Sequence, residues 1–514
     1  MKLFIVLLTG AFMLATGTSD VFAKKKEKVQ TEAKSDTVRT ASKKRNTQYP
    51  RLFKNKRVVT KKGLITIHKI DDKLYFEFPK SLLGREFLMG SSISATSDNT
   101  SGLVGQTMTT PLHIRFAIQE DQVYMQNVTP VSRMDVYSNQ SDISKAVAKS
   151  NITPDMESFK IAAYNMDSTA VVFEVTKFFL ADNKRLPLFD QNSSSLEDEK
   201  YGQLELKAVL KKNLSSIRNF YVFDDNLEIN LDMSFYQSLL ASKKEVRGGN
   251  VRVKAVYSML LLPEETMVWR LGDPRLGYTF TKKQKISTEK DGTAFSYLQH
   301  KWNLLPADEE AYRRGDLVAP RKPVVFYIDS DFPEAWKKAI KEGVNWWNEA
   351  FKMAGFKDAV QTADFPANDT TFYAGNLKYS CIRYVPVNLS KTQSKVWVDP
   401  RSGEIINGTI FVGHDIAKTI ASQRFVQTAQ VDERMRGIQL SEEVLLEGIR
   451  LYVAREVGHC LGLADNASAS AAFSVESLRS PEFTRQNGIA SSVMDELPYN
   501  YICLLYTSPS PRDS

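Results

Sequence analysis

The sequence feature that most constrains the fold is a predicted helix near the end of the chain. It starts at Ser441, a favoured N-cap residue followed by two glutamates that suit the positive end of the helix dipole. It is expected to run to Leu461, because Gly462 follows and glycine commonly ends a helix. Its last turns carry Glu456 and His459, which share one face of the helix. The helix therefore brings a carboxylate and an imidazole to one place.

The end of this helix and the residues after it read REVGHCLGLAD, which matches part of the zinc-binding pattern H-E-x-x-H-x-x-G-x-x-H. In that pattern the histidines bind one metal ion and the glutamate acts as general base. Glu456, His459 and Gly462 keep their positions in the pattern. Arg455 and Asp465 stand where the first and third histidines would be. Glu456 is therefore the candidate catalytic residue, and His459 and Asp465 are the candidate metal ligands.

A methionine downstream supports the match. Met494 lies in the sequence SVMD, which resembles the Met-turn that follows the zinc-binding helix in one group of zinc proteases. Agreement at several independent points of one pattern is stronger evidence than an isolated H-E-x-x-H.

From about residue 35 to residue 501 the chain resembles the large exported bacterial zinc-dependent metalloproteases related to the matrixins, in the metzincin clan. Besides the helix and the Met-turn, the likeness rests on DPRLGY from Asp273, WWNEAF from Trp346, AGF from Ala354, IRYVP from Ile382 and DPRSGEI from Asp399. The resemblance implies an α+β fold, with a mainly antiparallel β N-terminal region followed by a metzincin-like α/β catalytic-type domain. It also implies zinc as cofactor and a peptide or protein substrate, which zinc-activated water hydrolyses. The family has a further part after the Met-turn, so we expect this chain to be truncated there.

Arg455 argues against zinc binding by this particular chain. A guanidinium cannot donate an electron pair to a metal. At ~4 Å from a divalent ion, with an effective dielectric constant of ~20, it would repel the ion by about 8 kcal/mol. Zinc binding in protein sites is worth only ~10–16 kcal/mol, so most of the affinity would be lost. We therefore expect impaired catalysis.

The same charge suggests what replaces the metal. We predict that Arg455 pairs with Asp465 or Glu456, its positive charge standing in for the missing ion. His459 is then expected to be a hydrogen-bonded residue of the pocket. His414 could supply a replacement ligand only through an unusual geometry.

The apolar pattern of the chain changes character near residue 319. Before it, alternating apolar residues predict hairpins at 65–78 and 113–125 and further strands, so that residues 48–318 form a β-rich N-terminal region of two subdomains. Isolated His68, His113 and His300 in this region are expected to be structural.

Residues 319–502 are predicted to form the metzincin-like domain. A strand at 324–328 precedes a helix that Pro333 opens and Gly355 ends. Strands at 382–385, 396–398 and 405–412 complete a sheet with a long helix against it, and a turn at 399–403 precedes the last strand. Cys381, Cys460 and Cys503 are an odd number without close spacing, so neither a disulfide framework nor a cysteine metal site is expected.

The N-terminal residues predict export. An apolar run and a small-residue cleavage site identify residues 1–23 as a secretory signal, too short to span a bilayer, so no transmembrane segment is expected after cleavage. Basic residues 24–47 are poor in apolar side chains and are predicted to be a disordered leader, either a solvated linker or a contact for the cell envelope. No aromatic residues interleave these charges, which argues against nucleic-acid binding. Residues 503–514 fit no folded element and are expected to be a non-native tail.

Three functional interpretations follow. The first is an exported, periplasmic or secreted zinc metallopeptidase homologue whose own catalysis is impaired. The second is a non-catalytic pseudoprotease of the cell envelope that binds an extended peptide at an edge strand within residues 405–412. The third is a decayed or misassembled fragment without function.

Overall fold

The computed structural model describes residues 48–98, 102–105, 107–128, 134–136, 145–146, 149–189, 196–198, 202–286, 293–369, 372–387, 392–437, 439–495 and 499. The predicted signal sequence, the basic leader and the tail from residue 503 lie outside the described residues. The predicted domain boundaries remain predictions. No helix of the described part of the chain is long and apolar enough to cross a membrane.

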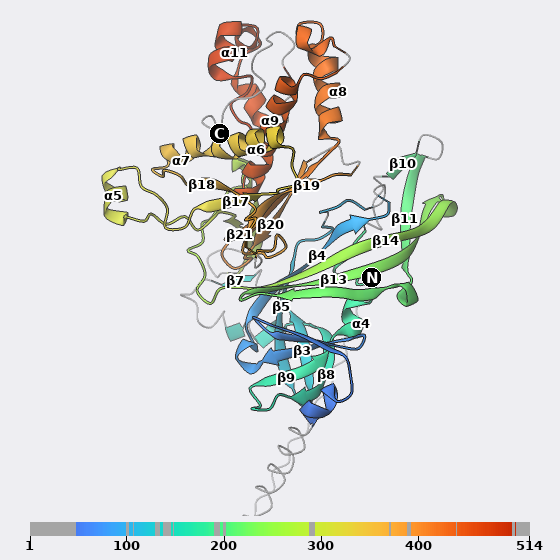
Figure 1. Ribbon diagram of the computed structural model, residues 1–514. Helices are drawn as coiled ribbons and strands as arrows, with labels where there is room; N and C mark the ends of the chain where they lie inside the picture. The colour runs from blue at the N-terminus through green and yellow to red at the C-terminus, as the bar shows by residue number, and fades with distance from the viewer. Residues whose placement is uncertain are drawn as a thin grey trace, which may run out of the picture.

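The first half of the chain forms a 13-stranded sheet in which all neighbouring strands are antiparallel. Its order is β1-β2-β3-β9-β8-β6-β5-β4-β14-β13-β11-β10, with β12 paired to β13 (Figure 1). The strands are β1 Val58–Lys62, β2 Thr66–Ile70, β3 Lys73–Pro79, β4 Glu86–Thr96, β5 Leu112–Gln119, β6 Gln122–Asn127, β8 Asp155–Tyr164, β9 Ala170–Glu174, β10 Leu196–Asp198, β11 Gly202–Leu210, β12 Ser216–Val222, β13 Asn226–Ala241 and β14 Lys244–Leu261.

The predicted hairpins are confirmed. β2 and β3 pair across a turn in which Asp71 has φ +53°, and β5 and β6 pair across a turn in which Glu120 has φ +53°. Alternation along β13 places Leu227 and Ile229 in the core and Glu228 on the opposite face. The two faces of this sheet are therefore an apolar core and a polar outer surface.

A small sheet connects the two halves. It contains β7 Met134–Val136, β15 Phe280–Ile286 and β16 Ala294–Gln299, in the order β16-β15-β7. His300 follows β16 directly.

The second half of the chain is a five-stranded sheet covered on one face by helices, as predicted. Its order is β18-β17-β19-β21-β20, and all pairs are parallel except β20 with β21. The strands are β17 Val324–Ile328, β18 Val360–Asp364, β19 Ser380–Val385, β20 Thr392–Val398 and β21 Ile405–Gly413. This half also contains α6 Glu334–Asn345, α7 Trp347–Met353, α8 Ile416–Thr428 and α9 Glu442–Cys460. α6 and α9 pack together over the sheet, and the large N-terminal sheet lies beyond its other face (Figure 1).

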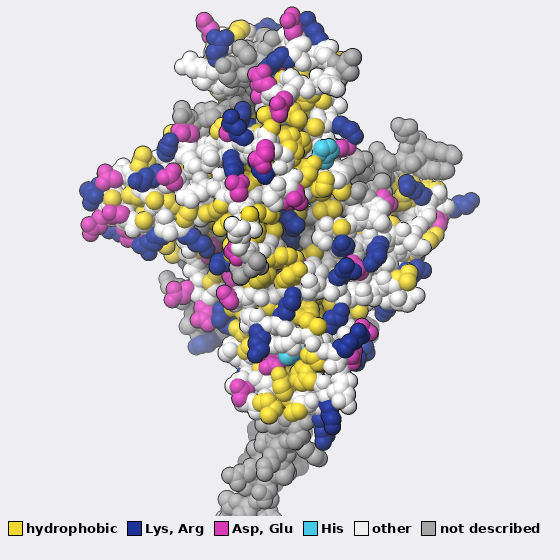
Figure 2. Space-filling view, in the orientation of Figure 1, with side chains coloured by type: hydrophobic (Ala, Val, Ile, Leu, Met, Phe, Trp, Pro, Cys, Tyr) yellow, Lys and Arg dark blue, Asp and Glu magenta, His cyan; other side chains and the backbone are white. Residues whose placement is uncertain are grey.

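Short helices complete the fold. They are α4 Thr176–Phe179, α5 Glu309–Arg314, α10 Val475–Leu478 and α11 Pro481–Asn487, together with the 3-10 turns η1 Lys80–Leu82, η2 Lys212–Leu214, η3 Pro274–Leu276, η4 Glu433–Met435 and η5 Ala467–Ala472. Figure 2 shows basic and acidic side chains interspersed around α5, at the left of that face. Arg314 at the end of α5 and Asp316 just after it form an exposed ion pair.

Two details of the sequence prediction were wrong. The helix predicted from Pro333 to Gly355 is interrupted at Trp346, where the hydrogen bond from the Glu349 amide to the Trp346 carbonyl tightens the turn from four residues to three. The strand predicted as an edge, within Ile405–Val412, is internal, because the chain folds β20 back antiparallel beside it. Among the described strands of this sheet, β18 and β20 are the two edges.

Candidate functional site

The helix α9 has the ends that its sequence predicts. The Ser441 hydroxyl accepts a hydrogen bond from the Val444 amide at 3.4 Å, and Glu442 and Glu443 lie in the first turn. After the helix, Gly462 has φ +96°, and a Cβ atom there would lie 2.5 Å from the His300 carbonyl oxygen. Only glycine satisfies both conditions, so this turn fixes where the following residues lie.

The segment after Gly462 is held by the N-terminal half of the chain. The Thr279 amide donates to the Gly462 carbonyl at 2.8 Å, and the Ala464 amide donates to the Gly277 carbonyl at 2.8 Å. Leu463 forms an isolated antiparallel bridge with Tyr278. This pairing gives the DPRLGY sequence a role in the site. By holding residues 462–464 it positions the next residue, Asp465.

Arg455, His459 and Asp465 come together at the end of α9. Arg455 Nη2 donates to Asp465 Oδ1 at 2.6 Å, and His459 Nε2 lies 3.4 Å from the same oxygen. The predicted contact between Arg455 and Asp465 is thus confirmed. His459 Nδ1 lies 3.0 Å from the Leu463 carbonyl oxygen, which can only accept, so this nitrogen carries the hydrogen. One carboxylate oxygen therefore lies between a guanidinium and an imidazole.

Glu456, on the same helix, has a different partner from Arg455 and His459. Its side chain is buried, and Thr392 Oγ1 of β20 donates to Glu456 Oε1 at 2.9 Å. Sequence reasoning missed Thr392, because 64 residues separate the two partners and no local pattern connects them. The candidate base is therefore fixed to the edge strand of the sheet.

Met494 lies directly beneath the helix. Its side chain is buried, and a Cβ atom at Gly458 would overlap the Met494 sulfur. The Met494 amide donates to the Ser492 hydroxyl at 3.1 Å, and the Met494 carbonyl accepts from the Asn466 amide at 3.0 Å. These contacts place a tight turn under the residue that precedes His459.

The side chains at this site do not fit a zinc ion. Zinc needs three protein donors with free electron pairs, and Arg455 has none to give. Asp465 Oδ1 already accepts from Arg455. No group of three or more His, Cys, Asp or Glu residues in the described part of the chain could hold a metal ion. The arrangement is an ion pair with a neighbouring histidine at the positions of the metal ligands.

The other histidines have partners of their own, which agrees with the structural role predicted for His68 and His113. His68 lies between the Thr60 hydroxyl and the Glu77 carboxylate, and His113 contacts Glu86. His414 Nδ1 lies 2.6 Å from the Tyr384 hydroxyl, and its ring stacks on Trp336. His414 therefore contacts side chains of β19 and α6, and in the described part of the chain it belongs to no group of three ligand residues.

His300 predicts how stability depends on pH. It lies between the hydroxyls of Thr279 and Thr281, and burial lowers its pKa to about 4. Between about pH 6.5 and pH 4 the unfolded chain binds a proton that the folded chain does not, so the free energy of unfolding falls as the pH falls, by roughly 3 kcal/mol in total. Above this window His300 is neutral in both the folded and the unfolded chain, so its contribution to the free energy of unfolding no longer changes with pH. Urea titrations of wild type and His300→Gln at pH values across the window test this.

The His300→Gln variant is expected to show a weaker loss of stability on acidification than wild type. His414→Gln, a change at an exposed histidine, is the control and should follow wild type. Equal pH dependence of wild type and His300→Gln would contradict the assignment.

Three family models match parts of this chain. Residues 437–504, which contain α9 and Met494, match the family described as Met-zincin. Residues 105–307 match "Domain of unknown function (DUF5117)", and residues 47–96 match "Domain of unknown function (DUF5118)". Neither a curated protein nor a solved structure matches the chain. The C-terminal region is therefore metzincin-like, within the α+β fold that the sequence predicts.

Proposed function

We propose that this chain is a metzincin-like peptide-binding protein that derives from a zinc metallopeptidase but does not hydrolyse peptides through zinc. The observation that carries the proposal is the contact between Arg455 and Asp465, which occupies the positions of two metal ligands. The Met-zincin match supports the descent. Export to the periplasm or medium, and contact of the basic leader with the envelope, belong to the same proposal as predictions from the sequence.

The ion pair supports loss of the metal because the Asp465 carboxylate is already paired with a cation. Arg455 is about one-fifth exposed and Asp465 more than half exposed. Bringing in a divalent ion would require breaking this pair and placing the guanidinium beside a second positive charge. The guanidinium of Arg455 instead provides the positive charge that balances the negative charge of the Asp465 carboxylate.

The edge strand supports peptide binding. β20 pairs with β21 on one side, and on its other side no strand of the described chain is paired. Thr392 at the start of β20 holds Glu456, so this edge adjoins the helix end that carries His459. An extended peptide can add to such an edge through its backbone amides and carbonyls.

Binding of short unstructured peptides in the presence of EDTA tests the proposal. We expect saturable binding, measured by fluorescence anisotropy, without cleavage, measured by mass spectrometry. Each peptide that binds is then compared with two N-methylated copies of itself. One copy is methylated at the odd-numbered residues and the other at the even-numbered residues. Because only alternate amides of an added strand face its partner, one copy should bind much more weakly than the other.

Three results would contradict the proposal. Peptide cleavage that EDTA abolishes would show a working zinc enzyme. Equal binding by both methylated copies would exclude strand addition. The absence of any peptide binding would exclude the proposed function altogether.

A further inference from the structure

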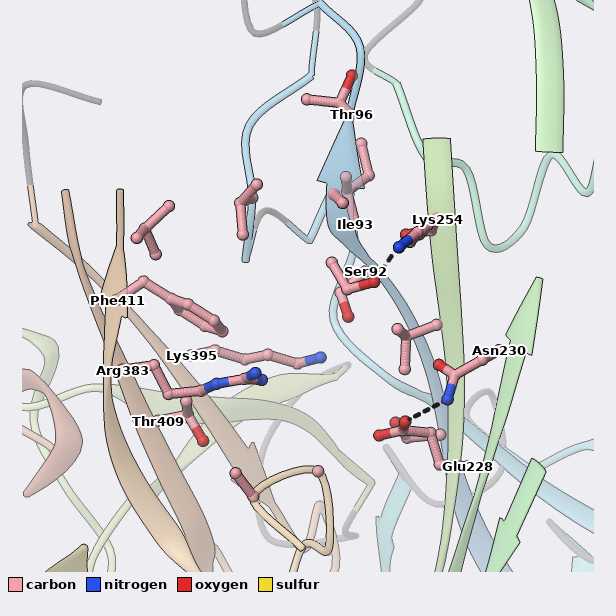
Figure 3. Close-up of a pocket in the computed structure, with 18 of the residues that line it drawn as sticks. Ser92, Ile93, Thr96, Glu228, Asn230, Lys254, Arg383, Lys395, Thr409 and Phe411 are labelled. Carbon is pink, nitrogen blue, oxygen red and sulfur yellow. Dashed lines mark hydrogen bonds between the residues drawn. The ribbon is translucent and has the colours of Figure 1, made fainter. Parts of the chain in front are cut away.

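A cavity of about 470 Å³ lies between the two halves of the molecule. One wall is the face of the five-stranded sheet that points away from α9, and the other is the outer face of β4, β13 and β14 (Figure 3). Alternation along β20 explains the first wall: Thr392 and Val396 face α9, whereas Lys395 and Trp397 face the cavity. The cavity is thus distinct from the site at the end of α9.

Two cations project into the cavity from the five-stranded sheet. Figure 3 shows Arg383 of β19 and Lys395 of β20 side by side, with both side chains directed toward the opposite wall. The Arg383 guanidinium lies 5.8 Å from the centre of the Phe411 ring, and the Lys395 ammonium lies 5.1 Å from that of Trp397. Among the described residues, neither cation forms an ion pair with a carboxylate.

The carboxylates of the opposite wall are already engaged. Glu228 Oε1 accepts from the Tyr373 hydroxyl at 2.5 Å and from Asn230 Nδ2 at 2.9 Å. Asp232 pairs with Arg218 at 3.3 Å and with Arg252 at 2.8 Å. Four cations and two carboxylates line the cavity, namely Arg218, Lys254, Arg383, Lys395, Glu228 and Asp232. Positive charge is therefore in excess on the side of Arg383 and Lys395.

The surroundings of Lys395 show that its charge lacks compensation. Burial lowers the pKa of Lys395 to about 8, although the negative charge of Glu228 acts in the opposite direction. Lys395 is half-buried, and an ammonium that loses part of its hydration without gaining a carboxylate partner is destabilised in its charged form. An anion bound beside it would supply that partner.

We propose that this cavity binds a small molecule that carries a carboxylate or phosphate group, held by Arg383 and Lys395. The planar guanidinium can donate two parallel hydrogen bonds to either group, and the ammonium adds a charge-assisted bond. Phe411, which lines the cavity, presents ring surface to the rest of the ligand. The volume lies within the range of ~300–1,000 Å³ typical of small-molecule sites.

The ligand would contact both halves of the chain at once. Lys254 belongs to β14 and Lys395 to β20, on opposite walls. A molecule that spans them would join the large N-terminal sheet to the edge strand that holds Glu456. Binding is therefore expected to raise the thermal unfolding temperature of the full chain, increasingly so as the ligand concentration rises above its dissociation constant.

Titration calorimetry of the full chain with inorganic phosphate and with citrate tests the proposal and separates the two chemistries. We expect saturable binding of at least one of them. Arg383→Gln and Lys395→Met should each weaken that binding by at least ~10-fold, because each removes a charge-assisted contact. Lys357→Met, which removes an exposed lysine elsewhere, is the control and should bind as wild type.

A pH series adds an independent readout for Lys395. Between about pH 7 and pH 9 the ammonium loses its proton, so the affinity for citrate, whose carboxylates stay ionised throughout, should fall in wild type and fall less in Lys395→Met. The charged groups around it are Arg383, Lys254 and Glu228. No saturable binding of either anion, or equal binding by wild type and both cavity variants, would overturn the proposal.

Discussion

Changing Arg455 and Asp465 together to histidine is expected to give the chain a zinc site of sub-micromolar affinity. The two substitutions remove the guanidinium and supply two imidazoles beside His459, in the order that the zinc-binding pattern requires. Removing the positive charge alone eliminates a repulsion of about 8 kcal/mol at ~4 Å. The gain over wild type should therefore be at least ~1,000-fold. Competitive titration with a zinc-binding dye measures it.

The control for this experiment carries the same substitutions at an exposed ion pair. Arg314 and Asp316 form such a pair beside α5, at 3.2 Å, and can both be changed to histidine. This variant gains two histidines without the geometry of α9. If it binds zinc as tightly as the Arg455→His, Asp465→His variant, the end of α9 is not a former metal site.

Trp397→Ala is expected to lower the free energy of unfolding by about 3–5 kcal/mol. Trp397 is fully buried where the five-stranded sheet meets the large sheet, in a cluster with Leu88 and Leu260. A Cβ atom at Gly90 of β4 would lie 3.0 Å from the indole, so the ring packs directly on the backbone of that strand. Removing it leaves a cavity between the two halves of the molecule. Urea unfolding followed by circular dichroism measures the loss.

Trp269→Ala provides the matched control, because that tryptophan is 50% exposed. Its loss should change the free energy of unfolding by only about 0.5 kcal/mol. If the two variants were equally stable, Trp397 would not hold the two halves together. A large effect would show that β20, the strand that also carries Thr392, anchors the contact between the two halves.

Local sequence signals predicted much of the fold. The start of α9 was predicted from its serine cap and acidic first turn. Its end was predicted from Gly462, and the predicted last residue is one residue beyond the observed one. The turn at Asp71 fixed a hairpin, because the two strands it joins are neighbours in sequence. In these elements the partners that decide the structure lie close together along the chain.

Long-range contacts could not be predicted in this way. The order of the five-stranded sheet depends on where β21 is placed after β20. It lies between β19 and β20, so the prediction that it forms an edge was wrong. The bond between Thr392 and Glu456 and the cavity between the sheets likewise join residues far apart in sequence. The contact between Arg455 and Asp465 is the exception, because opposite charges at known positions of a motif predicted it.

The zinc content of the purified wild-type chain tests the central claim most directly. The protein is dialysed against zinc, freed of unbound metal and analysed by mass spectrometry of the elements, together with a competitive titration. The contact between Arg455 and Asp465 predicts far less than one zinc ion per chain and no sub-micromolar affinity. One zinc ion per chain, bound with sub-micromolar affinity, would contradict the account.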